Sequence, residues 1–204
     1  MNEINEIPTI NEISEAARRP LPFIKGCYIF GSRVYGTADR HSDWDIILIA
    51  NAPQDEIELN INNLNIHIVS PYKFQEWVNM NHIKAIECLF APDWARLVDF
   101  DCDFVYREER FRHTVSHTVS NSWVKCKKKL KQSEYRTGIK SLFHSLRIAD
   151  FGTQFAESGE IEFSSSNWIW DSLIDRDWTW LDLDQEWREL KNERMTQFRS
   201  VCKK

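Results

Sequence analysis

The stretch FGSRVYGTADRHSDWDIILIA, residues 30–50, contains the pattern that decides the fold of this chain. An apolar run enters it, Gly31 and Ser32 follow, and a spacer of ten residues separates them from Asp43. Asp45 comes two residues later and opens a second apolar run. Short apolar runs bounded by turn residues are typical of strands. The pattern therefore predicts a strand, a tight turn, a short helix or loop, and a second strand.

The two aspartates predict a metal site. Residues two apart in a strand point to the same face, so Asp43 and Asp45 would project together. Adjacent carboxylates repel unless a cation lies between them, and Mg²⁺ binds one or two carboxylates together with substrate phosphates. Gly31 lets the backbone approach a phosphate, and Ser32 adds a hydroxyl and an N–H donor. The alternative is a plain turn with solvated aspartates.

The motif also carries a family resemblance. Gly31-Ser32, ten residues and Asp43-Trp44-Asp45 resemble the GS-x10-DxD signature of the DNA polymerase β-like nucleotidyltransferase superfamily. Three later segments are similar to predicted nucleotidyltransferases found with RNA ligases, namely residues 67–74, 86–92 and 140–147. The resemblance implies an α/β (α+β) nucleotidyltransferase-like core with a mixed sheet, followed by an α-helical C-terminal region.

This resemblance implies an activity as well. The expected enzyme moves a nucleoside monophosphate from an NTP, such as ATP, to an acceptor hydroxyl, and the family association with RNA ligases implies an RNA acceptor in end processing or repair. Asp43 and Asp45 would hold Mg²⁺ or Mn²⁺, and Gly31, Ser32 and Arg33 would bind the phosphates. Similar small transferases modify a protein partner by AMPylation or modify a small molecule. The remaining alternative is a non-catalytic module that binds a nucleotide or RNA.

One position departs from the family pattern. Superfamily members usually carry a third acidic residue on the next strand, whereas the predicted strand 64–69, LNIHIV, has Asn65 and His67 on that face. A third carboxylate would be a metal ligand or a general base. Asn65 could coordinate a metal through its carbonyl, and His67 could act as the base or be an ordinary strand histidine. The acidic group Asp55, Glu56 and Glu58 could instead fold back to supply the missing carboxylate, but no pattern in the sequence positions it. The sequence therefore supports nucleotide binding better than catalysis.

The resemblance and the change in periodicity near residue 105 predict three parts. They are a loosely ordered N-terminal segment (1–20), a nucleotidyltransferase-like α/β domain (21–105) and a helical domain (106–204). The spacing of apolar residues and of helix-breaking residues predicts strands over residues 25–30, 43–50 and 64–69 and helices over 12–19, 71–80, 82–89, 111–131 and 137–155.

A second set of candidate ligands lies in the last of these helices. Lys140, His144 and Arg147 are spaced by four and three residues, which places them on one helix face. They are similar to a KxxxHxxR helix of the resembled family, which implies a cationic face that binds the triphosphate. A solvent-exposed face is the alternative.

Three other features have two readings each. His113 and His117 have the spacing of a zinc pair, but no third ligand is evident, so a solvated helix face is the simpler interpretation. The lysines between residues 125 and 131 form a solvated face or steer a nucleotide or RNA backbone. The tryptophans of residues 168–187 form a core or a partner surface.

Composition bounds the class of protein. The chain has 204 residues, of which 42% are hydrophobic and 28% charged, as in ordinary globular proteins. A net charge of −5 argues against a general nucleic-acid coat. The N-terminus lacks the pattern of a signal peptide, and no apolar run is long enough for a membrane span, so we expect a cytoplasmic protein. Its five scattered cysteines predict reduced thiols.

Overall fold

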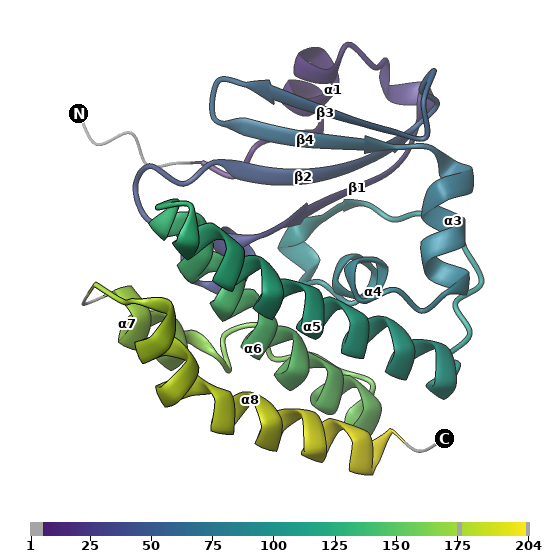
Figure 1. The fold of residues 1–204 in the computed structure, drawn as a ribbon. Coiled ribbons are helices and arrows are strands. Elements are labelled where there is room, and N and C mark those ends of the chain that lie inside the picture. The colour runs from purple at the N-terminus through teal and green to yellow at the C-terminus, as the bar shows by residue number, and fades with distance from the viewer. Residues whose placement is uncertain (1–5, 175–176, 203–204) are drawn as a thin grey trace. The chain divides into compact units, whose positions relative to one another are not determined.

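A mixed sheet forms the centre of the N-terminal part. The computed structural model describes residues 6–174 and 177–202, in which five strands pair in the order β3-β4-β2-β1-β5 (Figure 1). The neighbours β2 and β4 are parallel, and the other pairs are antiparallel. The α/β core with a mixed sheet is confirmed. The strands are β1 (Ile24–Phe30), β2 (Trp44–Ala50), β3 (Glu56–Ile61), β4 (Leu64–Val69) and β5 (Arg96–Val98).

Helices cover the sheet because their apolar residues alternate with the polar ones at helical spacing. Phe74 and Val78 of α3 and Ala85 and Cys88 of α4 join a buried cluster with side chains of β1, β2 and β4, among them Ile47. The helices of this part are α1 (Ile10–Ala17), α2 (Ser32–Tyr35), α3 (Pro71–Asn79) and α4 (Ile83–Leu89), with 3-10 turns at Leu21–Phe23 and Asp93–Ala95.

A helix lies within the N-terminal segment 1–20, for which loose order was expected, and residues 1–5 of that segment lie outside the described residues. Residues 10–17 form α1, which begins with a capping box in which Thr9 and Glu12 each satisfy a backbone N–H of the other. Ile13 and Ala17 are buried, and α1 contacts β4. Residues 10–17 are ordered because this amphipathic helix has a sheet to pack on.

Two strands were not predicted. Strand β3 has an alternating exposure in which Ile57, Leu59 and Ile61 are the less exposed residues, and it pairs with β4 along its whole length. Strand β5 has three residues and pairs with β1 at Val98 and Arg96. A three-residue strand carries too little periodicity to be recognised in a sequence.

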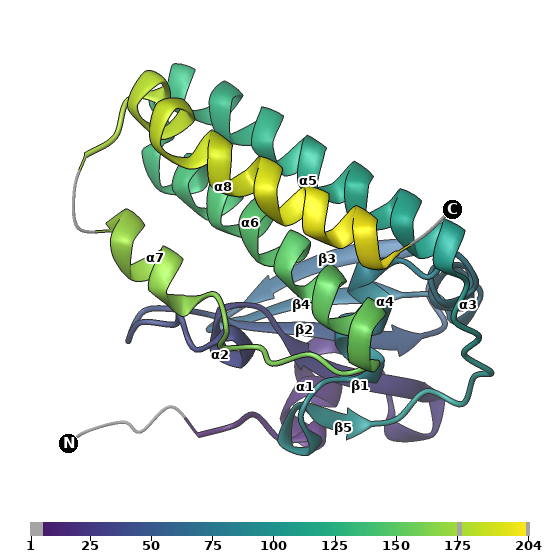
Figure 2. The ribbon, with the colours of Figure 1, turned by 90° about the horizontal axis from the view of Figure 1, so that it is seen from below.

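The chain divides into two compact units, which we describe separately. The first unit extends to Asn79 and resumes at Lys84–Val105, and the second contains Met80–Ile83 and the chain from Tyr106 onward. In the second unit α5, α6 and α8 run side by side (Figure 2). Its helices are α5 (Glu108–Lys131), α6 (Tyr135–Ser158), α7 (Asn167–Ile174) and α8 (Trp180–Val201).

Tryptophans build the core of this second unit. Trp178 and Trp187 are buried in a cluster with Leu142 and Leu146 of α6, and Trp123 of α5 packs against it. The core interpretation of the tryptophan-rich C-terminal region therefore holds for these side chains. In the described part of the chain, none of the helices combines the length and apolar character that crossing a membrane requires.

Candidate functional site

The predicted motif lies in the first unit, at the end of the sheet where β1 finishes and β2 and β4 begin. Phe30, the last residue of β1, is paired with Asp45 of β2, and Asp45 is paired with Asn65 of β4. Directly paired residues of neighbouring strands share a face of the sheet. The three side chains therefore form one row, which we call the Asp45 row, and the GS and DxD motifs meet beside it.

Gly31 is in contact with Asp45. Its φ of 79° and ψ of −159° lie in a region that only glycine adopts readily. A Cβ at this position would lie 2.1 Å from Oδ2 of Asp45. Helix α2 begins at Ser32, and the N–H groups of Val34 and Tyr35 bond to the carbonyl of Gly31. The glycine is required both for the turn and for the space that the carboxylate occupies.

The DxD motif keeps its alternation. Asp43 is exposed and precedes β2 by one residue, Trp44 is 4% exposed, and Asp45 is half-buried. Trp44 thus anchors the start of the strand while the aspartates on either side remain accessible. The predicted strand is one residue longer than the observed β2, a difference within the usual uncertainty of helix and strand ends.

Arg33 is held in place by the loop that precedes Asp43. Its Nη2 donates a hydrogen bond to the carbonyl of Ser42, and its Cζ lies 4.2 Å from the centroid of the Trp44 ring. A guanidinium stacked on an aromatic ring and bonded to a carbonyl fixes both groups. In this geometry Arg33 stabilises the position of the DxD motif. Its predicted contact with a triphosphate stays a prediction.

Asn65 occupies the position of the third carboxylate. Its Nδ2 donates a hydrogen bond of 2.9 Å to Oδ1 of Asp45. An amide can neither add negative charge nor accept a proton as a carboxylate does. Its predicted coordination of a metal through the carbonyl stays a prediction, and in this arrangement the amide acts by orienting Asp45.

His67 lies on the same face as Asn65 and has partners at both ring nitrogens. Nε2 is 3.0 Å from Oε2 of Glu56, and Nδ1 is 3.1 Å from Nζ of Lys84. Burial lowers the pKa of His67, and the positive charge of Lys84 lowers it further against the opposing effect of Glu56. Acting as a general base, as predicted, would require His67 to give up one of these contacts.

Lys84 was missed in the sequence, and Glu56 was noted only as part of an acidic group that no pattern placed. Glu56 lies on the unpredicted strand β3, whose alternation of acidic and aliphatic residues was the available signal. Lys84 lies in the first turn of α4 and meets His67 only through the packing of that helix on the sheet. No spacing rule in the sequence connects a residue of a helix with one of a strand in this way.

The predicted cationic helix face belongs to the second unit. On α6, Lys140 is exposed, His144 is half-buried and Arg147 is 1% exposed. Nη2 of Arg147 lies 2.9 Å from Nδ1 of His144, and its Cζ lies 4.7 Å from the centroid of the Phe151 ring. Arg147 is therefore not part of a solvent-exposed face. Triphosphate binding by these three residues stays a prediction.

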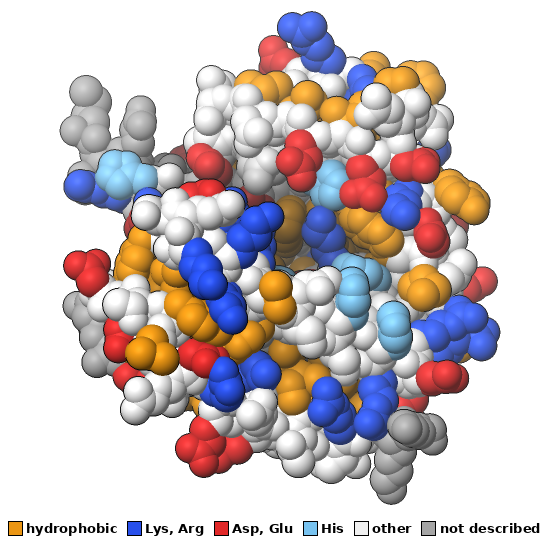
Figure 3. Space-filling view, viewed as in Figure 1, with side chains coloured by type: hydrophobic (Ala, Val, Ile, Leu, Met, Phe, Trp, Pro, Cys, Tyr) orange, Lys and Arg blue, Asp and Glu red, His pale blue; other side chains and the backbone are white. Residues whose placement is uncertain are grey.

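The remaining candidate ligands are histidines and lysines of α5. The rings of His113 and His117 stack with their centroids 6.2 Å apart, and both residues are exposed. Within residues 6–174 and 177–202, no three His, Cys, Asp or Glu side chains group as metal ligands would. Lys and Arg side chains gather over the C-terminal half of α5 (Figure 3), where Lys129 pairs with Glu134. These observations favour solvated faces.

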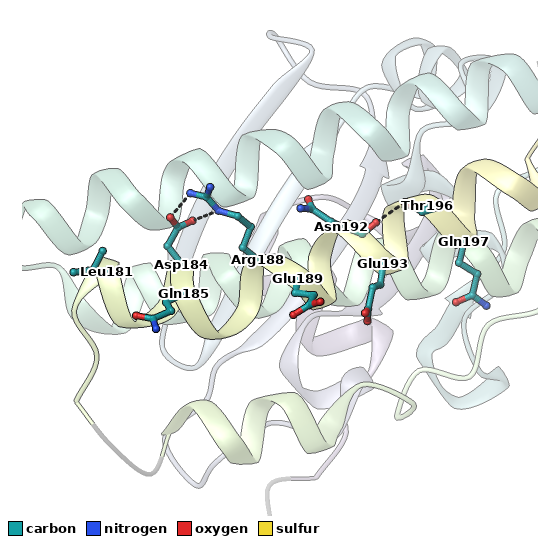
Figure 4. Close-up of a pocket in the computed structure, with 9 residues that line it drawn as sticks. All are labelled: Leu181, Asp184, Gln185, Arg188, Glu189, Asn192, Glu193, Thr196 and Gln197. Atoms are coloured by element: carbon teal, nitrogen blue, oxygen red, sulfur yellow. Dashed lines mark hydrogen bonds and ion pairs between the residues drawn. The ribbon is translucent and has the colours of Figure 1, made fainter.

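A hollow of about 920 Å³ lies along α8, and none of the residues that line it is a predicted site residue. Figure 4 shows that Arg188 and Asp184 bond to each other on this helix. The hollow has polar and mixed-charge walls and offers no set of groups for phosphate or metal chemistry. The residues that line it are Leu181, Asp184, Gln185, Arg188, Glu189, Asn192, Glu193, Thr196 and Gln197.

Comparison with known proteins places the site in a family. A family model described as a nucleotidyltransferase domain matches residues 10–130, which include the GS and DxD motifs and the whole sheet. No curated protein matches the chain. Among solved structures, a nucleotidyltransferase-like protein from Exiguobacterium sibiricum 255-15 is similar, with 11% identity and a TM-score of 0.32, over 93% of this chain and 71% of that one. At that distance the similar structure adds no argument about the site.

Proposed function

This chain belongs to the nucleotidyltransferase domain family, and we propose that it transfers a nucleoside monophosphate from an NTP to an acceptor hydroxyl with the help of Mg²⁺ or Mn²⁺. The observation that carries the proposal is the contact of Asp45 with Gly31 where β1 ends and β2 begins, next to the start of α2. The acceptor oxygen would attack the α-phosphorus as the bond to the β-phosphate oxygen breaks, and pyrophosphate would leave.

The residues of the site fit a divalent cation that arrives with a nucleotide. Asp43 and Asp45 offer carboxylates on either side of the buried Trp44, and Mg²⁺ commonly takes one or two carboxylates and completes its shell with phosphate oxygens and water. When bound, the cation would neutralise charge on the phosphates in the transition state. Gly31 leaves room for the Asp45 carboxylate beside the backbone, and Ser32 would supply a hydroxyl donor to a phosphate.

The cationic residues of α6 complete the proposal. Lys140, His144 and Arg147 are proposed as triphosphate ligands on the resemblance to the family's KxxxHxxR helix, with the exposed Lys140 as the first choice. The acceptor that the resemblance favours is an RNA end. A protein hydroxyl is the other acceptor that transferases of this kind use.

A second candidate function is favoured by Asn65. Because this amide stands where a third carboxylate would be and donates to Asp45, the site lacks a carboxylate base for the attacking hydroxyl. A protein with this arrangement would bind an NTP and a divalent cation but transfer nothing. Binding and turnover therefore have to be measured separately.

The test measures both on one set of proteins. Thermal unfolding is followed with each NTP, with and without Mg²⁺ or Mn²⁺, and pyrophosphate release is followed with RNA present. A ligand at about 100 times its Kd adds about 2.7 kcal/mol to the free energy of unfolding. Wild type should show a metal-dependent shift that Asp45→Asn loses and the exposed control Asp101→Asn keeps.

The outcomes separate the functions. Metal-dependent release of pyrophosphate supports the transferase. A metal-dependent shift without release supports the non-catalytic module. No shift with any NTP contradicts both.

A further inference from the structure

Lys84 lies beside the Asp45 row without a role in the proposed function so far. Its Nζ is 3.1 Å from Nδ1 of His67. The same atom is 5.0 Å from the centroid of the Trp77 ring and 5.8 Å from that of Phe30. An ammonium bonded on one side and placed over two aromatic rings is held in a defined position.

The hydrogen bonds of His67 follow from the chemistry of its partners. A lysine ammonium has only donors, so Nδ1 of His67 accepts the bond from Lys84. A neutral imidazole then carries its proton on Nε2, which donates to Oε2 of Glu56 at 3.0 Å. His67 therefore connects the Glu56 carboxylate of β3 to the Lys84 ammonium of α4 through two hydrogen bonds.

The strand register places this ammonium on the face of the sheet that carries Asp45. Phe30 of β1 and His67 of β4 lie on this face and on either side of β2, with Asp45 paired to Phe30 and Ile47 paired to His67. The contacts of Lys84 with Phe30 and His67 therefore bracket the segment of β2 from Asp45 to Ile47.

We propose that Lys84 contacts a phosphate oxygen of the bound NTP, and that His67 and Glu56 are positioning residues that hold its ammonium for this contact. The proposal rests on the proposed function, since it assumes that an NTP binds at Asp45. A triphosphate carries more negative charge than one divalent cation neutralises. Arg33 of the same unit is bonded to Ser42 and stacked on Trp44, so Lys84 is the cation of this unit that we assign to the phosphates.

The first experiment replaces Lys84 by methionine, which keeps the length of the side chain and removes its charge. Calorimetric titration with ATP, ADP, AMP and inorganic tripolyphosphate is carried out in the presence of Mg²⁺. We expect ATP and tripolyphosphate to bind about 10- to 100-fold more weakly to Lys84→Met, the range for a lost hydrogen bond to a charged group. Binding of AMP should change little, and Lys84→Arg should retain part of the affinity.

The control is Lys25→Met, which removes an exposed lysine of β1 in the same unit. It should bind ATP as wild type does. If Lys84→Met unfolds below the assay temperature, Lys84→Gln gives the same comparison, because its amide can still donate to Nδ1 of His67 while it lacks the charge.

The positioning role is tested with two substitutions of His67. His67→Gln can accept from Lys84 and donate to Glu56, whereas His67→Ala makes neither bond. If His67 holds the ammonium in place, His67→Gln should bind tripolyphosphate nearly as tightly as wild type, and His67→Ala should bind it about as weakly as Lys84→Met. The effect of His67→Ala should disappear in the Lys84→Met background, which a general loss of stability would not produce.

Failure of this inference and failure of the proposed function give different results. If wild type binds no NTP with any metal, the proposed function fails. Suppose that wild type binds ATP and Asp45→Asn does not. If Lys84→Met then binds ATP and tripolyphosphate as tightly as wild type, only the role of Lys84 is overturned. Weak binding of tripolyphosphate to His67→Gln, or a loss in His67→Ala that persists in the Lys84→Met background, would overturn the role of His67.

Discussion

Nδ2 of Asn65 donates a hydrogen bond of 2.9 Å to Oδ1 of Asp45, across the parallel pair of strands β2 and β4. The position at which related enzymes are expected to carry a third carboxylate is thus used to orient the second one. One oxygen of Asp45 is bonded to the amide, while the other lies against the backbone of Gly31. A cation that binds Asp45 therefore has to coordinate carboxylate oxygens whose orientation is already fixed by these two neighbours.

Replacing Asn65 by aspartate should make the protein more dependent on a divalent cation. Without metal, the new carboxylate removes the hydrogen bond and repels Asp45, which should lower the free energy of unfolding by about 1–3 kcal/mol. Mg²⁺ should restore much of this loss, and turnover should rise if a missing base limits it. Urea unfolding with and without Mg²⁺ measures the effect. Asn60→Asp, in the same register one strand further away, is the control, and equal Mg²⁺ responses in the two variants would contradict the prediction.

Gly31→Ala should abolish the response to nucleotides. The substitution forces alanine into a backbone region that costs roughly 1–3 kcal/mol and places its Cβ 2.1 Å from Oδ2 of Asp45. Gly159→Ala is the matched control, because Gly159 has a φ of 75° with no atom within 4 Å of the added Cβ. The control should lose roughly 1–2 kcal/mol of stability from strain alone and keep its metal-dependent shift with ATP. If Gly31→Ala retains the metal-dependent shift with ATP, the contact between Gly31 and Asp45 is not needed for nucleotide binding.

Arg33 should stabilise the free protein through Trp44. The guanidinium stacks on the indole at 4.2 Å, and such pairs contribute roughly 0.5–2 kcal/mol. A double-mutant cycle with Arg33→Ala and Trp44→Leu in the absence of nucleotide should give a coupling energy in this range. Arg33→Lys should recover little of it, since an ammonium lacks the planar stacking group. Simple additivity of the two substitutions would mean that the contact contributes nothing.

The stability of the first unit should depend on pH through His67. Its folded pKa lies below the unfolded value of 6.5, so the unfolded chain binds the proton more readily. The stabilising effect of a neutral His67 is complete above pH 6.5 and is lost as pH falls through the folded pKa. Urea midpoints between about pH 8 and about pH 5 should therefore fall more in wild type than in His67→Gln. Identical pH profiles would show that His67 has the same pKa folded and unfolded.

Asp150 should hold the loop between α6 and α7. Its Oδ2 accepts hydrogen bonds from Ser165 Oγ at 2.6 Å, Ser166 Oγ at 2.8 Å and Gln154 Nε2 at 3.1 Å. Asp150→Ala leaves these donors without their acceptor and should lower the free energy of unfolding by roughly 2–3 kcal/mol. The exposed Asp171 of α7 provides the control, and Asp171→Ala should stay within about 0.5 kcal/mol of wild type. Hydrogen exchange of the loop should rise in Asp150→Ala alone; equal exchange in both variants would contradict the assignment.

The sequence by itself determined the main strands and the long helices. β4 has the predicted bounds, Leu64–Val69, because its apolar residues alternate as a half-buried strand requires. The apolar stripe of α6 predicted a helix over 137–155, and the observed helix, Tyr135–Ser158, contains it. The GS and DxD motifs also placed Gly31 and Asp45 at one end of neighbouring strands.

The sequence was less informative where a residue type masked the pattern. Strand β3 alternates, but its more exposed face carries Glu56 and Glu58, which suggested an acidic group that could fold back toward the site, and no strand was predicted. An edge strand with one face in water can hold such residues, since only its inner face has to be apolar.

Only the tertiary structure decided which side chains of different elements meet. Lys84 and His67 come together because α4 packs on one face of the sheet, and Arg33 reaches Trp44 because the loop from α2 folds back to the start of β2. Periodicity predicts which residues face the core, because burying an apolar side chain is favourable whichever element it packs against. A hydrogen bond requires two atoms within about 3 Å of each other, and that distance depends on strand register and helix docking, which the whole core sets.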